Sequence, residues 1–388
     1  MSVYAAVMTG AGAGAIATIQ VVGEEAEDTL RKVFRRPGDG PFNLPKGRVL
    51  VGHILDGDDQ VDQVTLGCED HQTFAVHCHG NPLIVQRVLG LLRRHGAAIL
   101  PAEQMLVRLA TRDADRSTIE AEVRLALTTV KTMAGAELIA NQITAGLLQR
   151  VRHWQASLDP NSLSQIRAEA GQILADSEPA RLIIEGCTIV LIGPPNTGKS
   201  TLLNALAGRE KAIVTDVPGT TRDWISTEIH IPPLVATVID TAGLDAALAA
   251  DSAQVDTAAQ QRSLEILDRA DLVLLVLDLT RPTYAIPPTL TNVLAGKRTL
   301  TVLNKADLVP AVATDSRPQA VATSAKTGAG IDNLTAAAHR TCAVADFPLH
   351  ATSAFTDRQR GLLERLTTGT SRVDAGAALD DLLYGPLA

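Results

Sequence analysis

Short apolar runs alternate with helical patterns through the middle of the chain. Residues 187–192 form an apolar, β-branched run typical of a buried strand, and residues 201–207 behind them have helical spacing. Further runs of the strand type occupy residues 235–240, 300–304 and 319–322. Strands that alternate with helices predict an α/β domain with a mostly parallel sheet.

A glycine-rich segment joins the first of these strands to its helix. Gly193 to Ser200 fits the pattern G-x-x-x-x-G-K-[ST] in the order strand, loop, helix. Glycines let the backbone N–H groups surround phosphates, the helix N-terminus adds positive potential, and a hydroxyl can ligate Mg²⁺. We therefore expect phosphate binding by Asn196, Thr197, Gly198, Lys199, Ser200 and Thr201.

Three later segments identify the base. Residues 235–243 end in D-T-A-G, so Asp240 can hold Mg²⁺ through water and the Gly243 N–H can reach a γ-phosphate. A carboxylate at Asp307 in N-K-x-D can accept from N1 and N2 of guanine, a donor pair that adenine lacks. The next loop can offer a backbone N–H to the guanine O6. The residues expected to bind the base are Asn304, Lys305, Asp307, Ser324, Ala325 and Lys326.

A lone glycine loop could be a chance match in a surface turn, but four segments in series exclude that explanation. The chain thus resembles the translation-factor-related GTPases. Residues 209–223 contain A-I-V-T-D-V-P-G-T-T-R-D, a run similar to the switch region of the MnmE (TrmE) tRNA-modification GTPases and related Era-like proteins.

The resemblance to MnmE implies roles for further residues. Asn196 would help to hold K⁺ against the phosphates, Thr215 would contact the nucleotide, and Thr221 would join Ser200 and Asp240 at Mg²⁺ and take part in catalysis. Leu244 stands where Ras-type GTPases carry a glutamine that orients water. The glutamate that positions water in this family would fall near Asp256, which is one methylene shorter.

The resemblance also implies the domain order. A small α+β domain (residues 1–115, folate-binding-like) would precede an α-helical domain (116–183 and 345–388) into which the GTPase domain (184–344) is inserted. Segments 9–23, 74–87, 119–149 and 355–360 carry the match outside the GTPase domain. We expect a helical stretch over 119–149 and a segment boundary at Asp176–Pro179, before the first GTPase strand.

Several positions depart from the family. The sequence given ends Leu383-Tyr-Gly-Pro-Leu-Ala388, without the family's C-x-G-K motif, and its last cysteine is Cys342. Gln20, residues 69–74 and residues 108–116 replace the family's folate-binding residues, which counts against folate as a cofactor.

The resemblance implies a homodimer that acts on tRNA with a flavoprotein partner, with GTP or GDP, Mg²⁺ and K⁺ as cofactors. Three readings stay open: a GTPase active in modification of the wobble uridine of tRNA, a GTPase switch that has lost this chemistry and serves another assembly or regulatory role, and a nucleotide-binding scaffold with negligible hydrolysis. Intact guanine and phosphate segments favour the first two over the third. The missing thiol and the altered folate residues favour the second over the first.

Composition limits the other function classes. The 388 residues suffice for two or three domains, and no run of eighteen apolar residues predicts a membrane span. No cleavable signal is visible, and four cysteines without framework spacing favour a reducing cytoplasm. The net charge of −8 gives no general attraction to DNA or RNA, and solvated helix faces explain Arg87, Arg93, Arg94, Arg108 and Arg150 better than an RNA patch does.

A metal site near residue 75 is the competing chemical reading. Cys68, His71, His77, Cys78 and His79 lie within twelve residues, and His77 with His79 would share one face of a strand. Cys68-x-x-His71 without a second well-spaced pair is poor zinc spacing. A structural turn of the N-terminal domain is therefore the favoured interpretation.

Overall fold

The computed structural model divides into two compact units, Met1–Arg116 and Ser117–Ala388. It describes residues 3–10, 12–37, 45–110, 117–209, 225–240, 265–281, 291–292, 294–309, 320–369 and 371–387. No helix among these residues is long and apolar enough to cross a membrane.

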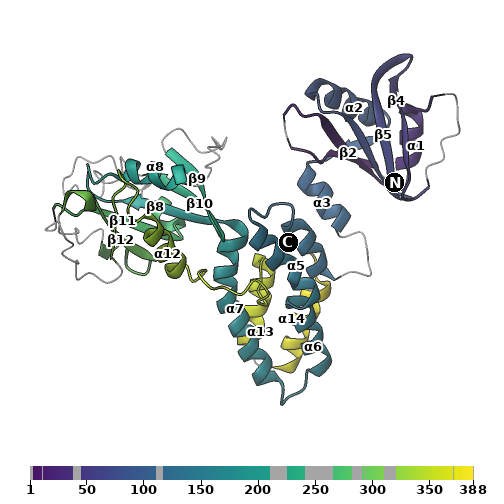
Figure 1. Cartoon of the computed structure of the whole chain (residues 1–388). Helices are drawn as coiled ribbons and strands as arrows, with labels where there is room; N and C mark the ends of the chain where they lie inside the picture. Colours follow the sequence, from purple (N-terminus) through teal and green to yellow (C-terminus); the bar gives the residue numbers. More distant parts are fainter. Residues whose placement is uncertain are drawn as a thin grey trace, which may run out of the picture. The chain divides into compact units, whose positions relative to one another are not determined.

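The first unit is built on a seven-stranded sheet with the order β3-β4-β5-β6-β2-β1-β7 (Figure 1). Neighbouring strands pair antiparallel, except β1 with β7. The strands are β1 (Val3–Val7), β2 (Ile16–Val22), β3 (Phe34–Arg35), β4 (Val49–Asp56), β5 (Asp59–Asp70), β6 (Thr73–His79) and β7 (Ala97–Ile99).

Helices α1 (Ala26–Val33) and α2 (Pro82–Arg94) cover one face of this sheet. Leu30 of α1 and Leu91 of α2 pack there on Ile19 and Leu66, because alternate residues of each strand point to the same side. On the opposite face, α3 (Ala102–Ala110) packs beside β1 through Met105. The chain thus forms an α+β unit in which helices cover one sheet face far more than the other.

The second unit contains a six-stranded sheet with the order β13-β12-β11-β8-β10-β9. All neighbours are parallel except β9 with β10. The strands are β8 (Cys187–Ile192), β9 (Ile225–Ile231), β10 (Leu234–Asp240), β11 (Leu272–Asp278), β12 (Thr299–Asn304) and β13 (Ala320–Ala322). The predicted strands over 187–192, 235–240 and 300–304 are therefore present as β8, β10 and β12.

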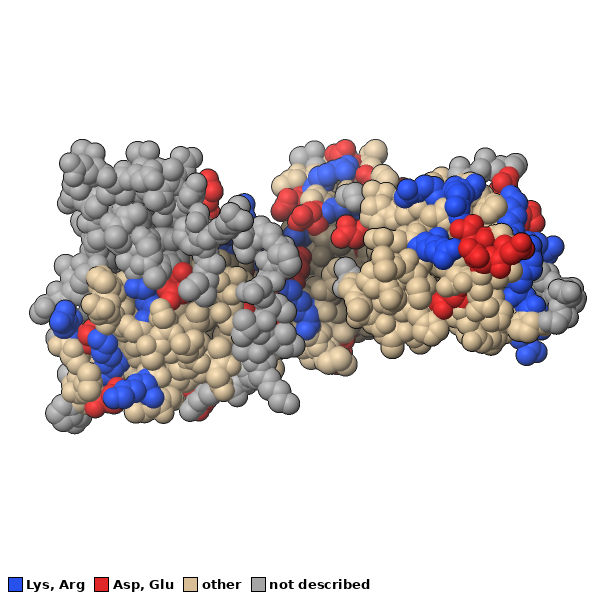
Figure 2. Space-filling model, turned by 90° about the horizontal axis from the view of Figure 1, so that it is seen from above, with Lys and Arg blue, Asp and Glu red and all other residues tan. Residues whose placement is uncertain are grey.

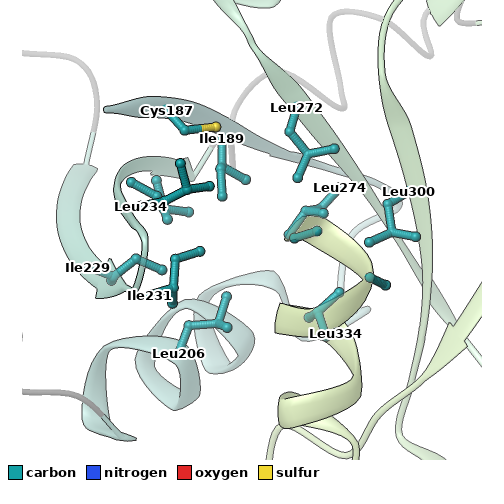
Figure 3. Close-up of a cluster of buried hydrophobic side chains, with 14 of the residues drawn as sticks. Cys187, Ile189, Leu206, Ile229, Ile231, Leu234, Leu272, Leu274, Leu300 and Leu334 are labelled. Carbon is teal, nitrogen blue, oxygen red and sulfur yellow. The ribbon is translucent and has the colours of Figure 1, made fainter. Parts of the chain in front are cut away.

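One face of this sheet forms the largest buried core, where α8 (Lys199–Arg209) and α12 (Ile331–Thr341) pack (Figure 3). Leu206 and Leu334 from the two helices meet Ile189, Leu274 and Leu300 of the central strands. The other face buries a second cluster around Val190, Val273 and Leu275. A sheet buried on both faces explains why its strands read as continuous apolar runs.

Helices that precede the six-stranded sheet in the sequence pack against helices that follow it. They are α4 (Thr118–Ala126), α5 (Met133–Thr144), α6 (Leu147–Ser157), α7 (Leu163–Glu185), α13 (Asp357–Thr368) and α14 (Arg372–Tyr384). Leu148 and Trp154 of α6 share a core with Leu363 of α13 and Leu379 of α14. The helical stretch predicted over 119–149 is present as α4, α5 and the start of α6. Thr132 starts α5 by accepting a hydrogen bond from the Gly135 N–H, and α6 begins after Gly146.

The segment boundary predicted at Asp176–Pro179 is wrong, since α7 runs through it to Glu185. Proline cannot donate to the preceding turn and normally breaks a helix. Here Ser177 Oγ bridges two segments: it donates to the Ile173 carbonyl (2.5 Å) and accepts from the Ala354 N–H (2.7 Å). Ala180 and neighbouring residues of α7 are buried against other helices, so tertiary packing outweighs the local effect of proline.

Helix α7 is tied to the six-stranded sheet by charged groups. Arg181 donates to Asp271 Oδ1 (2.5 Å), and Asp271 Oδ2 accepts from the backbone N–H of Thr188 in β8 (2.7 Å). A hydrogen bond from Arg181, opposed by burial, lowers the pKa of Glu178. This joint fixes the beginning of β8, the strand that leads into the glycine-rich loop.

Candidate nucleotide-binding site

The glycine-rich loop between β8 and α8 has the backbone conformation that phosphate binding requires. Gly193 and Gly198 have φ of 144° and 90°, and Asn196 adopts a left-handed φ of 63°. A Cβ atom at Gly193 would collide with the carbonyl of Val276, and one at Gly198 would lie 2.5 Å from Asn304 Nδ2. Both glycines are thus required by conformation and by close contacts with neighbouring strands.

Lys199 is the first residue of α8 and is only 7% exposed. Its Nζ donates to the loop carbonyls of Gly193 (2.7 Å) and Pro194 (3.2 Å). These contacts hold an ammonium group under the loop, at the positive end of the helix. An anion bound to the loop would therefore meet a cation that is already in place.

Ser200 and Asp240 bring a hydroxyl and a carboxylate together at the edge of the sheet. Ser200 Oγ donates to Asp240 Oδ2 (2.5 Å), whereas Asp240 Oδ1 is buried and has no hydrogen-bond partner among the described residues. A buried oxygen without a partner costs free energy unless a ligand satisfies it. Hard oxygen ligands are those that Mg²⁺ prefers, so this pair fits a magnesium site.

Asn304 lies at the end of β12 and joins two loops. Its Nδ2 donates to the Thr197 carbonyl of the glycine-rich loop (2.8 Å), and its Oδ1 accepts from the Ala325 N–H (2.9 Å). Thr323 Oγ1 makes a longer contact of 3.4 Å with the same oxygen. Asn304 is 2% exposed. It therefore connects the predicted phosphate segment to the predicted guanine segments without contacting solvent.

The predicted base-reading residues lie beside it. Ser324 Oγ donates to Asp307 Oδ1 (2.6 Å), which orients the carboxylate of the short 3₁₀ helix η1 (Ala306–Leu308). Ser324 also accepts from the Thr327 N–H (3.2 Å), so the loop that carries Ala325 and Lys326 is held in place. The structure thus brings Asn304, Asp307, Ser324 and Ala325 together.

Asp278 is a member of this site that the sequence analysis missed. It ends β11 in register with Asn304, and its Oδ2 accepts from Lys305 Nζ (2.7 Å). Burial opposes ionisation of Asp278, but hydrogen bonds from Lys305 and Thr280 outweigh it and lower the pKa of the carboxyl group. The signal was available, because residues 272–278 are an apolar run that ends in aspartate, as residues 235–240 are.

The remaining predicted residues differ in how far the structure describes them. Asn196, Thr201 and Lys326 are exposed at the surface. Thr215, Thr221, Gly243 and Asp256 lie outside the described residues. Asp240, Asp278 and Asn304 all end parallel strands at one sheet edge, the place where α/β proteins bind ligands.

Outside this site, the residues that depart from the family's folate positions contact each other. Gln20 Nε2 donates to Glu69 Oε1 (3.1 Å). Several of the arginines considered for RNA binding are engaged locally: Arg94 pairs with Asp56 (2.6 Å) and Arg87 with Asp59 (3.6 Å). Figure 2 shows lysine and arginine side chains beside aspartate and glutamate on the described part of one face.

Known proteins resemble both the GTPase segment and nearly the whole chain. The family model of the 50S ribosome-binding GTPase matches residues 188–305. A tRNA modification GTPase MnmE from Prochlorococcus marinus (strain MIT 9303) is 30% identical over 410 residues, which cover 95% of this chain and 86% of that protein. The MnmE of Synechococcus sp. (strain WH7803) is 31% identical over 96% of this chain and 87% of its own length.

Among solved structures, the G domain of FeoB from Methanococcus jannaschii is 28% identical. It aligns with 40% of this chain and 98% of its own, with a TM-score of 0.31. The glycine-rich loop, the predicted guanine segments and the similarity to relatives over 86–87% of their length agree. The chain belongs to the family of tRNA modification GTPases named MnmE.

Proposed function

We propose that this protein hydrolyses GTP to GDP and phosphate and uses the cycle as a switch in modification of the wobble uridine of tRNA. A homodimer and a flavoprotein partner belong to the same proposal. The observation that carries the GTPase part is Asn304, which joins the glycine-rich loop to the loop after β13 through two hydrogen bonds of 2.8 and 2.9 Å. The names of the similar relatives, and the large share of each chain that aligns, support the tRNA part.

The described residues divide the work of binding between them. Asp307, oriented by Ser324, would accept from N1 and N2 of guanine. The Ala325 N–H donates to Asn304 Oδ1, which holds the loop that would meet the guanine carbonyl. Lys199 places positive charge beside the β- and γ-phosphates. Ser200 and Asp240 would hold Mg²⁺, directly and through water, and a bound Mg²⁺ neutralises charge that develops on the transferred phosphoryl group.

Potassium is the second ion in the proposal. Asn196 would hold K⁺ against the phosphates, where it would stabilise transition-state charge in place of an arginine finger. Its exposed side chain supports this role because an ion can reach it, and its left-handed backbone is a conformation that asparagine adopts more readily than most residues.

Catalytic roles for Thr221 and Asp256 are also proposed. Thr221 would complete the magnesium site, Thr215 and Gly243 would contact the nucleotide, and Asp256 would position the attacking water. Asp256→Asn should then lower kcat with little change in GTP binding, the pattern of an interaction made in the transition state. Equal turnover in wild type, Asp256→Asn and Asp256→Glu would contradict the role of Asp256.

We also infer that the GTPase domain is inserted into the helical domain and follows the small N-terminal domain. In support, the six-stranded sheet lies between α7 and α13 in the sequence, while these two helices share a buried core. Folding of α7 with α13 would bring the ends of the inserted segment together.

Turnover of GTP and ATP by the purified chain in K⁺ or Na⁺ buffer tests nucleotide, ion and activity together. We expect Mg²⁺-dependent hydrolysis of GTP, not of ATP, with stimulation by K⁺ that Asn196→Ala abolishes. Asn204→Ala, an exposed asparagine further along α8 and outside the predicted site, is the matched control. Hydrolysis of both nucleotides would contradict the guanine site, and a rate insensitive to the cation would contradict the potassium site alone.

A further inference from the structure

The sheet of the N-terminal unit separates the histidines of β6 from its cysteine. Cys78 points into the core beneath α1 and α2, together with Cys68 of β5. His77 and His79 alternate with Cys78 along β6 and lie on the opposite face. That face is open within the described residues around Ile16, Val49 and Val51, whose exposed fractions are 64%, 61% and 53%.

Each of the two imidazole rings is held by its Nδ1 atom. His79 Nδ1 lies 2.7 Å from Asp62 Oδ1, and the His79 backbone N–H donates to Asp62 Oδ2 (2.8 Å). A carboxylate only accepts, so the His79 Nδ1 carries the proton and the neutral ring has its lone pair at Nε2. His77 Nδ1 lies 2.9 Å from Thr18 Oγ1, which can accept in the same way.

This arrangement is the one that orients histidine ligands in metal proteins. A metal-bound histidine usually donates its second ring N–H to a carboxylate or another oxygen, which fixes the tautomer and the ring. Asp62 is 7% exposed, and its oxygens accept three N–H groups, including the backbone N–H of Gln63. The group that holds His79 is therefore itself rigid.

The two rings border one cavity. A pocket of about 250 Å³ is lined by His77 and His79 together with Gln63 and Thr65 of β5 and apolar side chains of Val51 and Ile16. None of the described residues that line it is a lysine or arginine, so none of them opposes a metal ion there by its charge. We propose that His77 and His79 bind a divalent transition-metal ion, Zn²⁺ being the candidate, through their Nε2 atoms.

The number of ligands defines the kind of site. The described residues contain no cluster of three or more His, Cys, Asp or Glu side chains suited to a metal. Two imidazoles therefore leave coordination positions for water and for the Gln63 side-chain oxygen. Zinc accepts neutral nitrogen ligands with water in an open position, whereas Mg²⁺ and Ca²⁺ prefer oxygen, so the site would be distinct from the Ser200–Asp240 pair.

Isothermal titration of the full chain with ZnCl₂, in saturating MgCl₂ and GDP, tests the site. We expect saturable binding with a Kd in the micromolar range, weakened at least about tenfold by His77→Gln and by His79→Gln. Thr18→Val keeps both ligands but removes the partner of His77, and should also weaken binding, since such partners are worth roughly 10- to 100-fold in metal affinity.

His71→Gln is the matched control, because His71 is exposed in the turn between β5 and β6 and lies outside the pocket. Its Zn²⁺ affinity should equal that of the wild type. NMR of the imidazole groups gives a second readout, in which Zn²⁺ should shift the resonances of His77 and His79 and leave those of His71 unchanged. Equal Zn²⁺ affinity in all four variants, loss with only one of the two ligand variants, or no saturable binding would each overturn the proposal.

Discussion

The two halves of the proposed nucleotide site differ in how far the protein alone completes them. On the guanine side, Asn304, Asp307 and Ser324 are satisfied by hydrogen bonds within the protein. On the phosphate side, Asp240 Oδ1 is buried without a described partner, and Lys199 Nζ donates to two carbonyls of the glycine-rich loop. The proposed base-reading half is therefore preorganised, whereas the proposed phosphate half holds a buried carboxylate oxygen that a bound metal ion would satisfy.

Because of this difference, we expect substitutions on the two sides to affect different properties of the protein. A substitution on the guanine side should lower local stability as well as nucleotide specificity, because the loops lose hydrogen-bond partners. A change on the phosphate side should leave the fold intact and remove transition-state stabilisation. The following predictions test that separation, in order of decreasing effect.

Asp240→Asn should produce the largest loss. The amide oxygen can still accept from Ser200 Oγ, but the charge that would hold Mg²⁺ through water is gone. We expect kcat for GTP hydrolysis to fall about 100-fold or more, the usual size for loss of a preorganised electrostatic group. Single-turnover hydrolysis measures it, with unchanged GDP binding in the absence of Mg²⁺ as the control. A kcat within threefold of wild type would refute the magnesium role.

Asn304→Ala should act on the structure of the site. It leaves the Thr197 carbonyl and the Ala325 N–H without their partner, and an unsatisfied buried group costs roughly 1–3 kcal/mol. We expect the Ala325 amide to exchange hydrogen about thirtyfold faster, since about 2 kcal/mol of local stability is lost.

Thr323→Val removes only the 3.4 Å contact to Asn304 and is the matched control. Its exchange rate at Ala325 should stay close to that of the wild type. Hydrogen exchange is preferable to global unfolding here, because a chain with two compact units need not unfold in a single step. Equal protection of Ala325 in Asn304→Ala and wild type would remove Asn304 as the connection between the loops.

Asp307→Asn should change which base is bound. The amide presents a donor where guanine N1 also donates, whereas xanthine offers an oxygen at the position of the guanine amino group. We expect GTP affinity to fall more than tenfold and affinity for xanthosine triphosphate to rise, as in sites built around hydrogen bonds. Competition binding with both nucleotides provides the measurement. If GTP affinity stays unchanged, Asp307 does not read the base.

Motifs predicted which segments form the site, but the sequence did not show how they contact each other. The glycine loop, N-K-x-D and the loop after β13 stand out because each has a local pattern tied to a strand end. The hydrogen bond from Asn304 to Thr197 joins residues 107 positions apart, and no local pattern encodes it. Asp278 was missed for a related reason, since a lone aspartate after a strand acquires meaning only when β11 and β12 pair in register.

At helix boundaries, a clear local pattern gave the wrong prediction. Pro179 and the acidic residues before it predict an interruption locally, yet α7 continues because its buried face packs on α13. For the histidines, the spacing i, i+2 was visible in the sequence, while the partners Asp62 and Thr18 come from two other strands. Thus local chemistry was predictable, and partners across strands were not.

Asp278→Asn should have the smallest effect and sharpen the comparison most. The variant keeps the shape of the side chain but removes the charge that pairs with Lys305, which is 30% exposed and can be solvated instead. We expect GDP affinity to fall two- to fivefold, about 0.5–1 kcal/mol, since partly exposed ion pairs contribute little. Because the folded-state pKa of Asp278 is lowered below its ordinary value of 3.8, its contribution is fully present above that value and is lost only as pH falls through the lower pKa. The ratio of GDP Kd values between variant and wild type should therefore be the same at pH 8 and pH 5, as measured by fluorescence titration with a labelled GDP. A ratio that shrinks between those pH values would mean that Lys305 does not keep Asp278 ionised, and the guanine side would then be less preorganised than its hydrogen bonds indicate.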